Sequence, residues 1–226
     1  MDPKELAACS AVAAVASGQV IGLGSGSTSM LALQALGRRI RDEGLAIRGV
    51  PTSLSTEREA KRLGIPLTTL EQDPDLDLAL DGADQVDAAL CAIKGRGGAL
   101  LREKIVARCA RRLLIMVDAS KLAEVLDIAV PIEVLPFAAG VARRGLELLG
   151  GRPALRRTTV GEAYLTDNGN HILDVDFGPI PRPAPLAERI AAVPGVVDHG
   201  LFVGLVAELH VGEAGAARVV RRPSAR

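Results

Sequence analysis

The sequence predicts an α/β fold in which a mostly parallel sheet is flanked by helices, together with a smaller α+β domain. Short apolar runs alternate with helix-length segments through the first half of the chain, as they do in βαβ units. Glycine-rich or hydroxyl-rich turns follow two of these runs, at residues 22–28 and 52–56. Beyond Asp127, prolines and a Gly-Gly pair interrupt the pattern, which indicates a second unit of different architecture.

The first element is expected to be a helix that begins close to Met1. Asp2 suits the N-cap, Pro3 the first helical position, and Glu5 the return contact of a capping box. The alanine-rich sequence then continues to about Ser17, and Gly18 can end the helix in a left-handed cap. The later elements of this half are strands expected at residues 20–23, 47–51, 76–80 and 113–117 and helices expected at 28–43, 57–63 and from about 99 onward.

The second half is expected to form the α+β domain. Residues 167–170, Asp-Asn-Gly-Asn, are typical of a hairpin turn, and they would join strands at 160–165 and 172–175. The other elements expected here are helices at 138–149 and 186–192 and strand-like runs at 201–205 and 208–211, which lead back toward the first sheet.

The domain boundaries follow from this change of pattern. We predict one domain of residues 1–129 plus about 204–226, and a smaller one of about 130–203. The arginines near the C-terminus stand among proline and serine without a helical pattern, so we expect a frayed, solvated end rather than a polyanion-binding tail. These arginines are Arg218, Arg221, Arg222 and Arg226.

The composition excludes several classes of partner. The formal net charge is zero, so the molecule as a whole does not attract polyanions. With three Phe, one Tyr and no Trp, the chain also lacks the aromatic platforms that stack on single-stranded nucleic acid. We therefore expect no nucleic-acid partner, and a core built from Ala, Val, Leu and Ile.

The cysteines and the apolar runs predict the compartment. Cys9, Cys91 and Cys109 are widely spaced and match neither a disulfide framework nor a CxxC site. The first residues lack the basic and apolar regions of a secretory signal, so none is expected, and no apolar stretch reaches the roughly 18 residues of a membrane span. The sequence predicts a soluble, cytoplasmic protein that does not bind membranes. No cluster of residues has metal-ligand spacing, so no metal site is expected.

The turn at residues 22–28, Gly-Leu-Gly-Ser-Gly-Ser-Thr, lies between a predicted strand and a predicted helix. Its pattern lacks the third glycine of a dinucleotide fingerprint and the Gly-Lys of a P-loop. It suits a single phosphate monoester at the helix N-terminus, or it is a tight turn in which Ser27 or Thr28 caps the helix. The turn at 52–57 adds hydroxyls, and there a cap at Ser55 or Thr56 is the favoured interpretation.

Acidic and basic residues gather after the third predicted strand. Asp81 and Asp84 follow that strand directly, and Lys94 and Glu103 come soon after. Moving a proton between adjacent carbons of a sugar needs a base, proton handling at two oxygens, and positive charge beside the enediolate. These residue types supply all three, although Glu103 would also fit an ordinary surface ion pair. The three histidines lie in the C-terminal half, and we expect them to be structural.

Taken together and in order, these motifs resemble those of ribose-5-phosphate isomerases of the A type. The matching segments are residues 22–28, 81–84, 94–100, 102–104, 118–121, 131–134, 166–170, 194–197 and 200–202. The resemblance implies a Rossmann-like domain with a smaller ferredoxin-like domain, and a homodimer or a homotetramer. It also implies cofactor-free interconversion of D-ribose 5-phosphate and D-ribulose 5-phosphate, a step of the pentose phosphate pathway, through an enediolate.

The resemblance also assigns roles to residues. Glu103 is expected to be the base that moves the proton between C1 and C2, and Lys94 to stabilise the oxyanion. Asp81 would assist ring opening, with Asp84 beside it. The residues expected to bind the pentose phosphate are Ser25, Gly26, Ser27, Thr28, Gly82, Ala83, Gly95, Arg96, Gly97, Lys121 and Lys4.

Two residues depart from the family pattern. Gln85 replaces the usual acidic residue after the second aspartate, and Arg96 stands where glycine is common. Arg96 would either restrict the backbone of the glycine-rich loop or add a contact to an anion.

Two other functions compete with that of a ribose-5-phosphate isomerase. An amino-sugar phosphate deaminase or isomerase would need a histidine near this edge, and a non-catalytic sugar-phosphate sensor would be expected to lose the catalytic acids, which are present here.

Overall fold

The computed structural model describes residues 2–222, which form two compact units. The first unit consists of the chain up to Ala83, the segment Arg102–Leu122, and the chain from Leu205 onward. The second consists of Asp84–Leu101 and Ala123–Gly204. Residues 84–101 and 123–129 therefore make most of their contacts with the second unit, whereas the sequence pattern groups them with the first.

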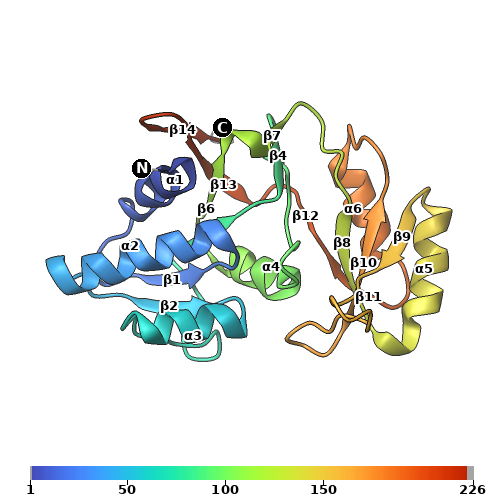
Figure 1. The fold of residues 1–226 in the computed structure, drawn as a ribbon, viewed down its shortest axis with the longest axis horizontal. Helices are drawn as coiled ribbons and strands as arrows, with labels where there is room; N and C mark the ends of the chain where they lie inside the picture. Colours follow the sequence, from blue (N-terminus) through green and yellow to red (C-terminus); the bar gives the residue numbers. More distant parts are fainter. Residues whose placement is uncertain (1, 223–226) are drawn as a thin grey trace. The chain divides into compact units, whose positions relative to one another are not determined.

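The first unit contains a six-stranded sheet, in the order β14-β13-β6-β3-β1-β2 (Figure 1). All neighbours pair in parallel except β13 and β14, which are antiparallel. This confirms the predicted, mostly parallel α/β sheet. The strands are β1 (Val20–Leu23), β2 (Arg48–Pro51), β3 (Leu78–Gly82), β6 (Leu113–Asp118), β13 (Val206–Gly212) and β14 (Ala217–Arg221).

Helices cover both faces of this sheet. α1 (Pro3–Val12) and α2 (Ser27–Glu43) share a buried aliphatic core with β1, β3 and β6, to which Leu36 and Leu80 belong. On the opposite face α4 (Leu100–Cys109) approaches closely, because a Cβ at Gly22 would lie 2.3 Å from Cγ1 of Val106. α3 (Leu54–Arg62) follows the edge strand β2.

α1 is shorter than its sequence predicts. It ends at Val12 and not near Ser17, and the chain continues as tight turns. The guanidinium of Arg39, on α2, donates to the carbonyls of Val12 and Val15 at 2.9 and 2.8 Å. These bonds satisfy carbonyl groups that a longer helix would have used internally. Asp2 is the N-cap residue, but its side chain makes no capping hydrogen bond, so the expected capping box is not formed.

The arginine-rich end of the chain is partly a strand, so the expectation of a frayed end is wrong for its described part. Arg218 and Arg221 belong to β14, which pairs with β13. Arg218 also forms a 3.1 Å ion pair with Glu213. The antiparallel ladder supplies long-range hydrogen bonds that local sequence patterns do not reveal. Arg226 lies outside the described residues.

His210 on β13 joins the sheet to α1. Its ring Nδ1 is hydrogen bonded to the hydroxyl of Ser10 at 2.9 Å, and the side chain is buried. Burial lowers the pKa of His210 below its ordinary value of 6.5; the charges of Arg221 and Arg112 act in the same direction, and Glu208 opposes them.

This histidine should make stability depend on pH. Below pH 6.5 the unfolded chain gains a proton on His210 that the folded chain does not take up, so stability falls as the pH drops toward the lowered pKa. The contribution is full above pH 6.5 and amounts to at most about 1.4 kcal/mol per pH unit. Urea unfolding between pH 7 and 5 should show a shallower dependence for His210→Gln than for the parent chain. Equal slopes would contradict this.

The second unit contains an antiparallel sheet in the order β11-β8-β10-β9. Along the chain its elements follow the β-α-β-β-α-β pattern of the ferredoxin-like fold, as the resemblance implied. α5 and α6 share a buried core with this sheet, including Val130, Ile132 and Ile190. The elements are β8 (Val130–Val134), α5 (Ala139–Leu148), β9 (Arg152–Leu155), β10 (His171–Asp176), α6 (Pro183–Ala191) and β11 (Val196–His199).

The hairpin expected around residues 167–170 uses a different partner strand. β10 pairs with Arg152–Leu155 and not with residues 160–165. β9 is an edge strand, where Pro153 is tolerated because its missing N–H is not needed. Residues 157–163 form a separate short excursion closed by a bridge between Arg157 and Ala163.

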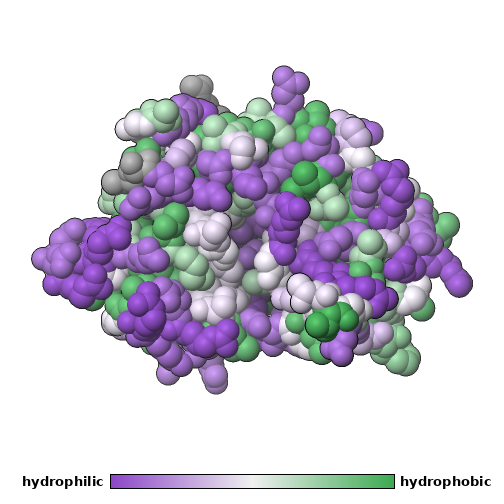
Figure 2. Space-filling model, viewed as in Figure 1, coloured by the Kyte–Doolittle hydropathy of each residue, from purple (hydrophilic) through white to green (hydrophobic). Residues whose placement is uncertain are grey.

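A smaller sheet completes the second unit, in the order β12-β5-β4-β7. Its strands are β12 (Leu201–Phe202), β5 (Ala92–Ile93), β4 (Gln85–Asp87) and β7 (Leu122–Ala123). Among the described residues, no helix is both long enough and apolar enough to cross a membrane. On the face drawn in Figure 2, hydrophobic residues are scattered among polar ones.

Candidate active site

The strands of the first unit end at one edge of the sheet, and the predicted site residues of this unit lie there. The parallel pairing places the ends of β1, β3 and β6 side by side. The loop after β1 leads into α2, and Asp81 lies near the end of β3. β6 ends at Asp118, which is followed by the 3₁₀ turn Ala119–Lys121. This is the edge at which open α/β sheets bind ligands.

Asp81 is buried and held by a set of hydrogen bonds. Its Oδ1 accepts from the backbone N–H of Ser25 at 3.1 Å and from the N–H of Gly82 at 2.8 Å. The hydroxyl of Ser29 donates to the same oxygen at 3.0 Å and accepts from the N–H of Gly82 at 3.1 Å. Because several donors converge on one oxygen, the orientation of the carboxylate is fixed. Thr28 also lies beside this turn, since a Cβ on Gly82 would be 3.8 Å from its Cβ.

Gly24 permits this arrangement, because a Cβ there would lie 2.1 Å from Oδ1 of Asp81 and 2.6 Å from the carbonyl oxygen of Leu80. Gly24→Ala should therefore displace the carboxylate, lower the activity of the site, and reduce the free energy of unfolding by about 1–3 kcal/mol. Urea unfolding and an activity assay measure both effects. Gly140→Ala is the matched control, because a Cβ on Gly140 would meet no atom within 4 Å and the site is the first turn of α5. Equal behaviour of the two variants would contradict the prediction.

Ser25 is held by hydroxyl groups of the neighbouring turn. Its Oγ lies 2.8 Å from the hydroxyls of Thr52 and Ser53 and 3.0 Å from that of Thr56. Ser53, and not Ser55 or Thr56, is the N-cap of α3, and it accepts from the N–H of Thr56 at 3.1 Å. The second hydroxyl-rich turn therefore supports the first. Ser27 and Thr28 begin α2, after Gly26 at the N-cap position.

Glu103 is 4% exposed and lies in the first turns of α4. It is one helical turn before Val106, which packs against Gly22, so both residues belong to the face of α4 that covers the sheet. In β3, Asp81 alternates with Leu80 and shares a sheet face with Ala79, which also lies next to Gly22. The structure thus places the carboxylates of Glu103 and Asp81 on the same side of the sheet.

The predicted cations Lys4 and Lys121 both act on Asp118. Burial would raise the pKa of Asp118, but hydrogen bonds from Ser120 and the charges of Lys4 and Lys121 outweigh it and lower the pKa. Lys4 reaches this edge because the start of α1 packs on the end of β13, where a Cβ on Gly212 would collide with the carbonyl oxygen of Pro3. The edge therefore carries two positive charges beside Asp118.

In the second unit, Lys94 follows β5 and is 2% exposed. Its Nζ lies 5.3 Å from the ring centroid of Phe202, and its backbone N–H donates to the carbonyl of Gly200 at 2.9 Å. A Cβ on Gly200 would lie 2.2 Å from the carbonyl oxygen of Lys94, so glycine is required for this approach. The ammonium is thus held on a rigid strand end.

The glycine-rich loop after Lys94 is tied to Asp84. The carboxylate of Asp84 accepts the backbone N–H of Arg96 at 3.0 Å. Arg96 is exposed and does not adopt a positive φ, so it does not force strain on the loop. Gly97 likewise has no positive φ, and no atom lies within 4 Å of a Cβ placed there. Of the two interpretations of Arg96, the restriction of the backbone is not supported.

The side chain of Gln85, which departs from the family pattern, is hydrogen bonded to Asp127. Its side-chain amide donates to the carboxylate of Asp127 at 2.6 Å and accepts the backbone N–H of the same residue at 2.8 Å. An acidic residue at this position would have no proton to donate and would face the charge of Asp127. The departure from the family pattern is therefore matched by a local partner.

Sequence reasoning missed Ser29, which contacts Asp81, and Arg156, which binds the glycine-rich loop. Ser29 follows the recognised motif by one residue, so a helical-wheel argument would have found it. Arg156 had no sequence signal, because it is 60 residues from the loop. Within the described chain, no three side chains of His, Cys, Asp or Glu gather as a metal site.

Known proteins resemble this chain over nearly its whole length. The family model of ribose 5-phosphate isomerase A (phosphoriboisomerase A) matches residues 48–215. The ribose-5-phosphate isomerase A of Methanosarcina acetivorans is 48% identical over 97% of this chain and 94% of its own length. That of a Synechococcus species is 50% identical over 91% of this chain and 90% of its own length.

Solved structures give the same result. Ribose 5-phosphate isomerase A from Methanocaldococcus jannaschii superposes with a TM-score of 0.93 at 40% identity, covering 97% of this chain and 98% of that one. A D-ribose-5-phosphate isomerase in complex with phospho-erythronic acid has a TM-score of 0.94 at 34% identity and covers 98% of this chain and all of that one, 100%. The likeness spans both units.

Proposed function

We propose, from the premise that this chain belongs to the ribose 5-phosphate isomerase A family, that Glu103 is the base of an aldose–ketose isomerase. The reaction interconverts D-ribose 5-phosphate and D-ribulose 5-phosphate, in keeping with the names of its relatives. The single observation that carries the role is the buried Glu103 carboxylate, on the same side of the sheet as Asp81. Glu103 is the one acidic residue of α4.

The chemistry needs only proton movements. The Glu103 carboxylate removes the proton from C2 of the open-chain aldose, and the C1 carbonyl oxygen gains a proton, which gives an enediol or its anion. Glu103 then returns its proton to C1, while the C2 hydroxyl loses its proton and becomes the ketone. Atoms and electrons balance without a cofactor, and positive charge beside the intermediate lowers the barrier. Lys94 is proposed to supply that charge.

Asp81 is proposed to act at the oxygens of the sugar. In solution ribose 5-phosphate is mainly a ring, so a proton must move between the ring oxygen and the C1 hydroxyl before isomerisation. The hydrogen bonds from Ser25, Ser29 and Gly82 hold the Asp81 carboxylate in one orientation, which suits such a transfer. Asp84 is proposed to support the site by holding the N–H of Arg96.

The phosphate is proposed to bind between the start of α2 and the cations near Asp118. Ser27 and Thr28 offer hydroxyls and helix N–H groups, and Lys4 and Lys121 offer charge. A solved relative holds phospho-erythronic acid, a phosphorylated sugar acid, which supports binding of an anionic sugar phosphate. Gly26, Gly82 and Ala83, all in the first unit, would line the backbone of this site.

The test of the function is formation of ribulose 5-phosphate from ribose 5-phosphate by the purified chain, with EDTA present. In D₂O, deuterium should also enter the product at C1, because the base exchanges its proton with solvent in the enediol state. Metal-independent turnover with deuterium incorporation supports the proposal. Calorimetric binding of ribose 5-phosphate without turnover would instead favour the sugar-phosphate sensor.

We also propose that the chain acts in the cytoplasm, in the pentose phosphate pathway, as a homodimer or homotetramer. Exposed apolar side chains on and beside α5 support self-association: Phe137 is 101% exposed and Leu148 is 81% exposed, and Val141 lies between them. Light scattering at several protein concentrations tests the oligomeric state, and a constant monomer mass would contradict it.

A further inference from the structure

The guanidinium of Arg156 lies at the centre of a contact set that includes the glycine-rich loop. Nη1 donates to the carbonyls of Gly95 at 3.3 Å and Arg96 at 2.9 Å. Nε donates to one carboxylate oxygen of Asp174 at 2.9 Å, and Nη2 forms a short bond to the other. The aromatic ring of Tyr164 lies 5.9 Å from the guanidinium carbon. Every nitrogen of the group therefore has a protein partner.

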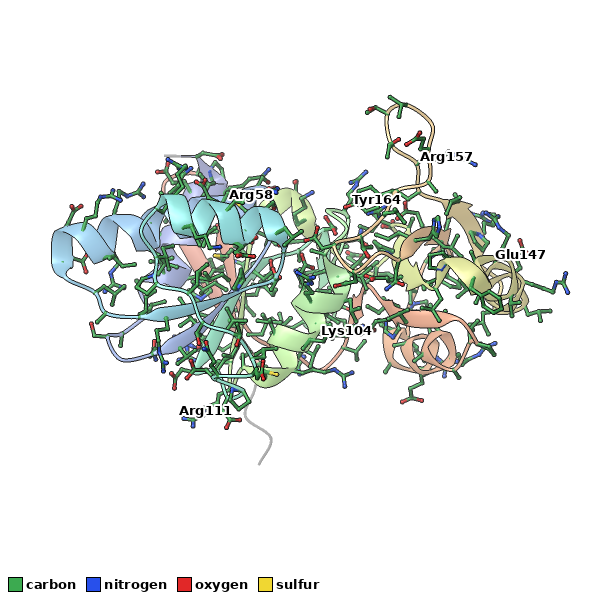
Figure 3. All side chains as sticks on the ribbon, turned by 90° about the horizontal axis from the view of Figure 1, so that it is seen from below. Arg58, Lys104, Arg111, Glu147, Arg157 and Tyr164 are labelled. Carbon is green, nitrogen blue, oxygen red and sulfur yellow. The ribbon has the colours of Figure 1, made fainter. Side chains whose placement is uncertain are left out.

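The conformation of the glycine-rich loop requires glycine at two positions. Gly95 and Gly98 have φ of +98° and +86°, a region that other residues rarely occupy. A Cβ on Gly98 would lie 2.3 Å from the hydroxyl oxygen of Tyr164, and that hydroxyl donates to the carbonyl of Gly97 at 3.4 Å. Figure 3 shows Tyr164 near the short excursion that carries Arg157. The loop is thus bound from the side of Arg156 and Tyr164.

The loop is also anchored by Asp84, whose carboxylate accepts the N–H of Arg96. The N–H of Arg96 is therefore bound by a carboxylate, and its carbonyl is bound by a guanidinium. Both anchors line the same cavity of about 390 Å³, whose other lining residues include Arg96, Asp174, Pro131 and Ile128. Both backbone polar groups of Arg96, two residues after Lys94, are therefore hydrogen bonded to side chains.

From these contacts we propose that Arg156, oriented by Asp174, is a positioning residue that fixes the glycine-rich loop and, through it, the ammonium of Lys94. This inference rests on the role proposed above for Lys94. It gives Arg156, which directly follows β9 in the second unit, a part in the reaction, although Arg156 belongs to none of the sequence motifs.

An arginine is suited to this task and a lysine is not. The planar fork binds both oxygens of Asp174 with Nε and Nη2 while Nη1 is directed at the loop carbonyls. Because the side chain of Arg156 is only 14% exposed, water competes weakly for these bonds. Loss of the fork would leave loop carbonyls without their donor and let the segment after Lys94 move.

The first experiment measures steady-state kinetics of Arg156→Ala with ribose 5-phosphate. We expect kcat to fall about 10- to 100-fold with KM within about threefold, because a displaced ammonium affects the transition state more than binding. Ethylguanidinium added to this variant should restore part of kcat, since it can refill the site. Arg157→Ala is the matched control; its side chain donates to the carbonyl of Gly161 and not to the loop. It should retain parental kcat and gain nothing from ethylguanidinium.

A second measurement does not depend on activity. Hydrogen exchange of the peptide that contains residues 95–98, without substrate, should be at least about tenfold faster in Arg156→Ala than in the parent or in Arg157→Ala. If Arg156→Ala folds poorly, Asp174→Asn is the alternative variant, because it keeps the size of the side chain. It should show the same changes to a smaller degree. Unchanged exchange, or an unchanged kcat in a folded Arg156→Ala, would overturn the inference. If the parent chain does not isomerise ribose 5-phosphate, the proposed function fails, and the exchange rates still decide the role of Arg156.

Discussion

Replacing Glu103 by glutamine should lower kcat for isomerisation of ribose 5-phosphate by at least about 100-fold and change the affinity for the substrate by less than about tenfold. The amide has nearly the same shape as the carboxylate but cannot accept the proton from C2. Since Glu103 is 4% exposed on the sheet-facing side of α4, solvent is a poor replacement for the missing base.

The measurement combines steady-state kinetics with calorimetric titration of ribose 5-phosphate. Glu147→Gln is the control, because it makes the same chemical change at an exposed position on α5 (Figure 3). The Glu103 variant should also stop deuterium incorporation at C1. A large loss of affinity with near-normal turnover would show that Glu103 binds substrate and is not the base.

Replacing Lys94 by methionine should lower kcat by about 100- to 1,000-fold, the usual cost of removing one group that stabilises an oxyanion. Methionine keeps an unbranched apolar side chain, one heavy atom shorter, that can remain in contact with the ring of Phe202. The expected loss therefore reports the missing charge and not a cavity. Steady-state kinetics measure the loss, and urea unfolding establishes that the variant is folded.

Lys61→Met provides the control for this substitution, because Lys61 is an exposed residue of α3 that pairs with Glu57. It should keep parental kcat. A Lys94→Met variant that is folded and within about threefold of parental kcat would remove Lys94 from the mechanism. It would also remove the basis for a positioning role of Arg156 in the reaction, although not its hold on the loop.

The features that the sequence predicted correctly are those with local signals. The strand at 20–23 is a short continuous apolar run, and a glycine in left-handed conformation, Gly44, closes the helix that ends at Glu43. Asp81 could be placed because a buried strand precedes it and the position at a strand end is itself informative. Ordered motifs then supplied the family, which the comparisons confirm.

The errors arise where distant residues decide the local structure. The carbonyls of Val12 and Val15, at and after the end of α1, accept from Arg39, which is 27 and 24 residues further along the chain. The partner of β10 is a proline-containing edge strand, which propensity rules discount. The contact of Arg156 with the loop spans 60 residues, and only the folded chain reveals it. Local pattern therefore predicted strand ends and motifs, and tertiary contacts determined what surrounds them.

The path of the chain has a consequence for dissecting the molecule. The backbone passes between the two units at Ala83, Leu101, Leu122 and Gly204, so neither unit is a continuous segment. A fragment cut at residues 130 and 203 would retain β12 but lack β5, the strand with which β12 pairs. It would expose unsatisfied backbone groups and lose Lys94 and its loop. Gene fragments or circular permutants of this protein should therefore keep residues 84–101 joined to the unit that they stabilise.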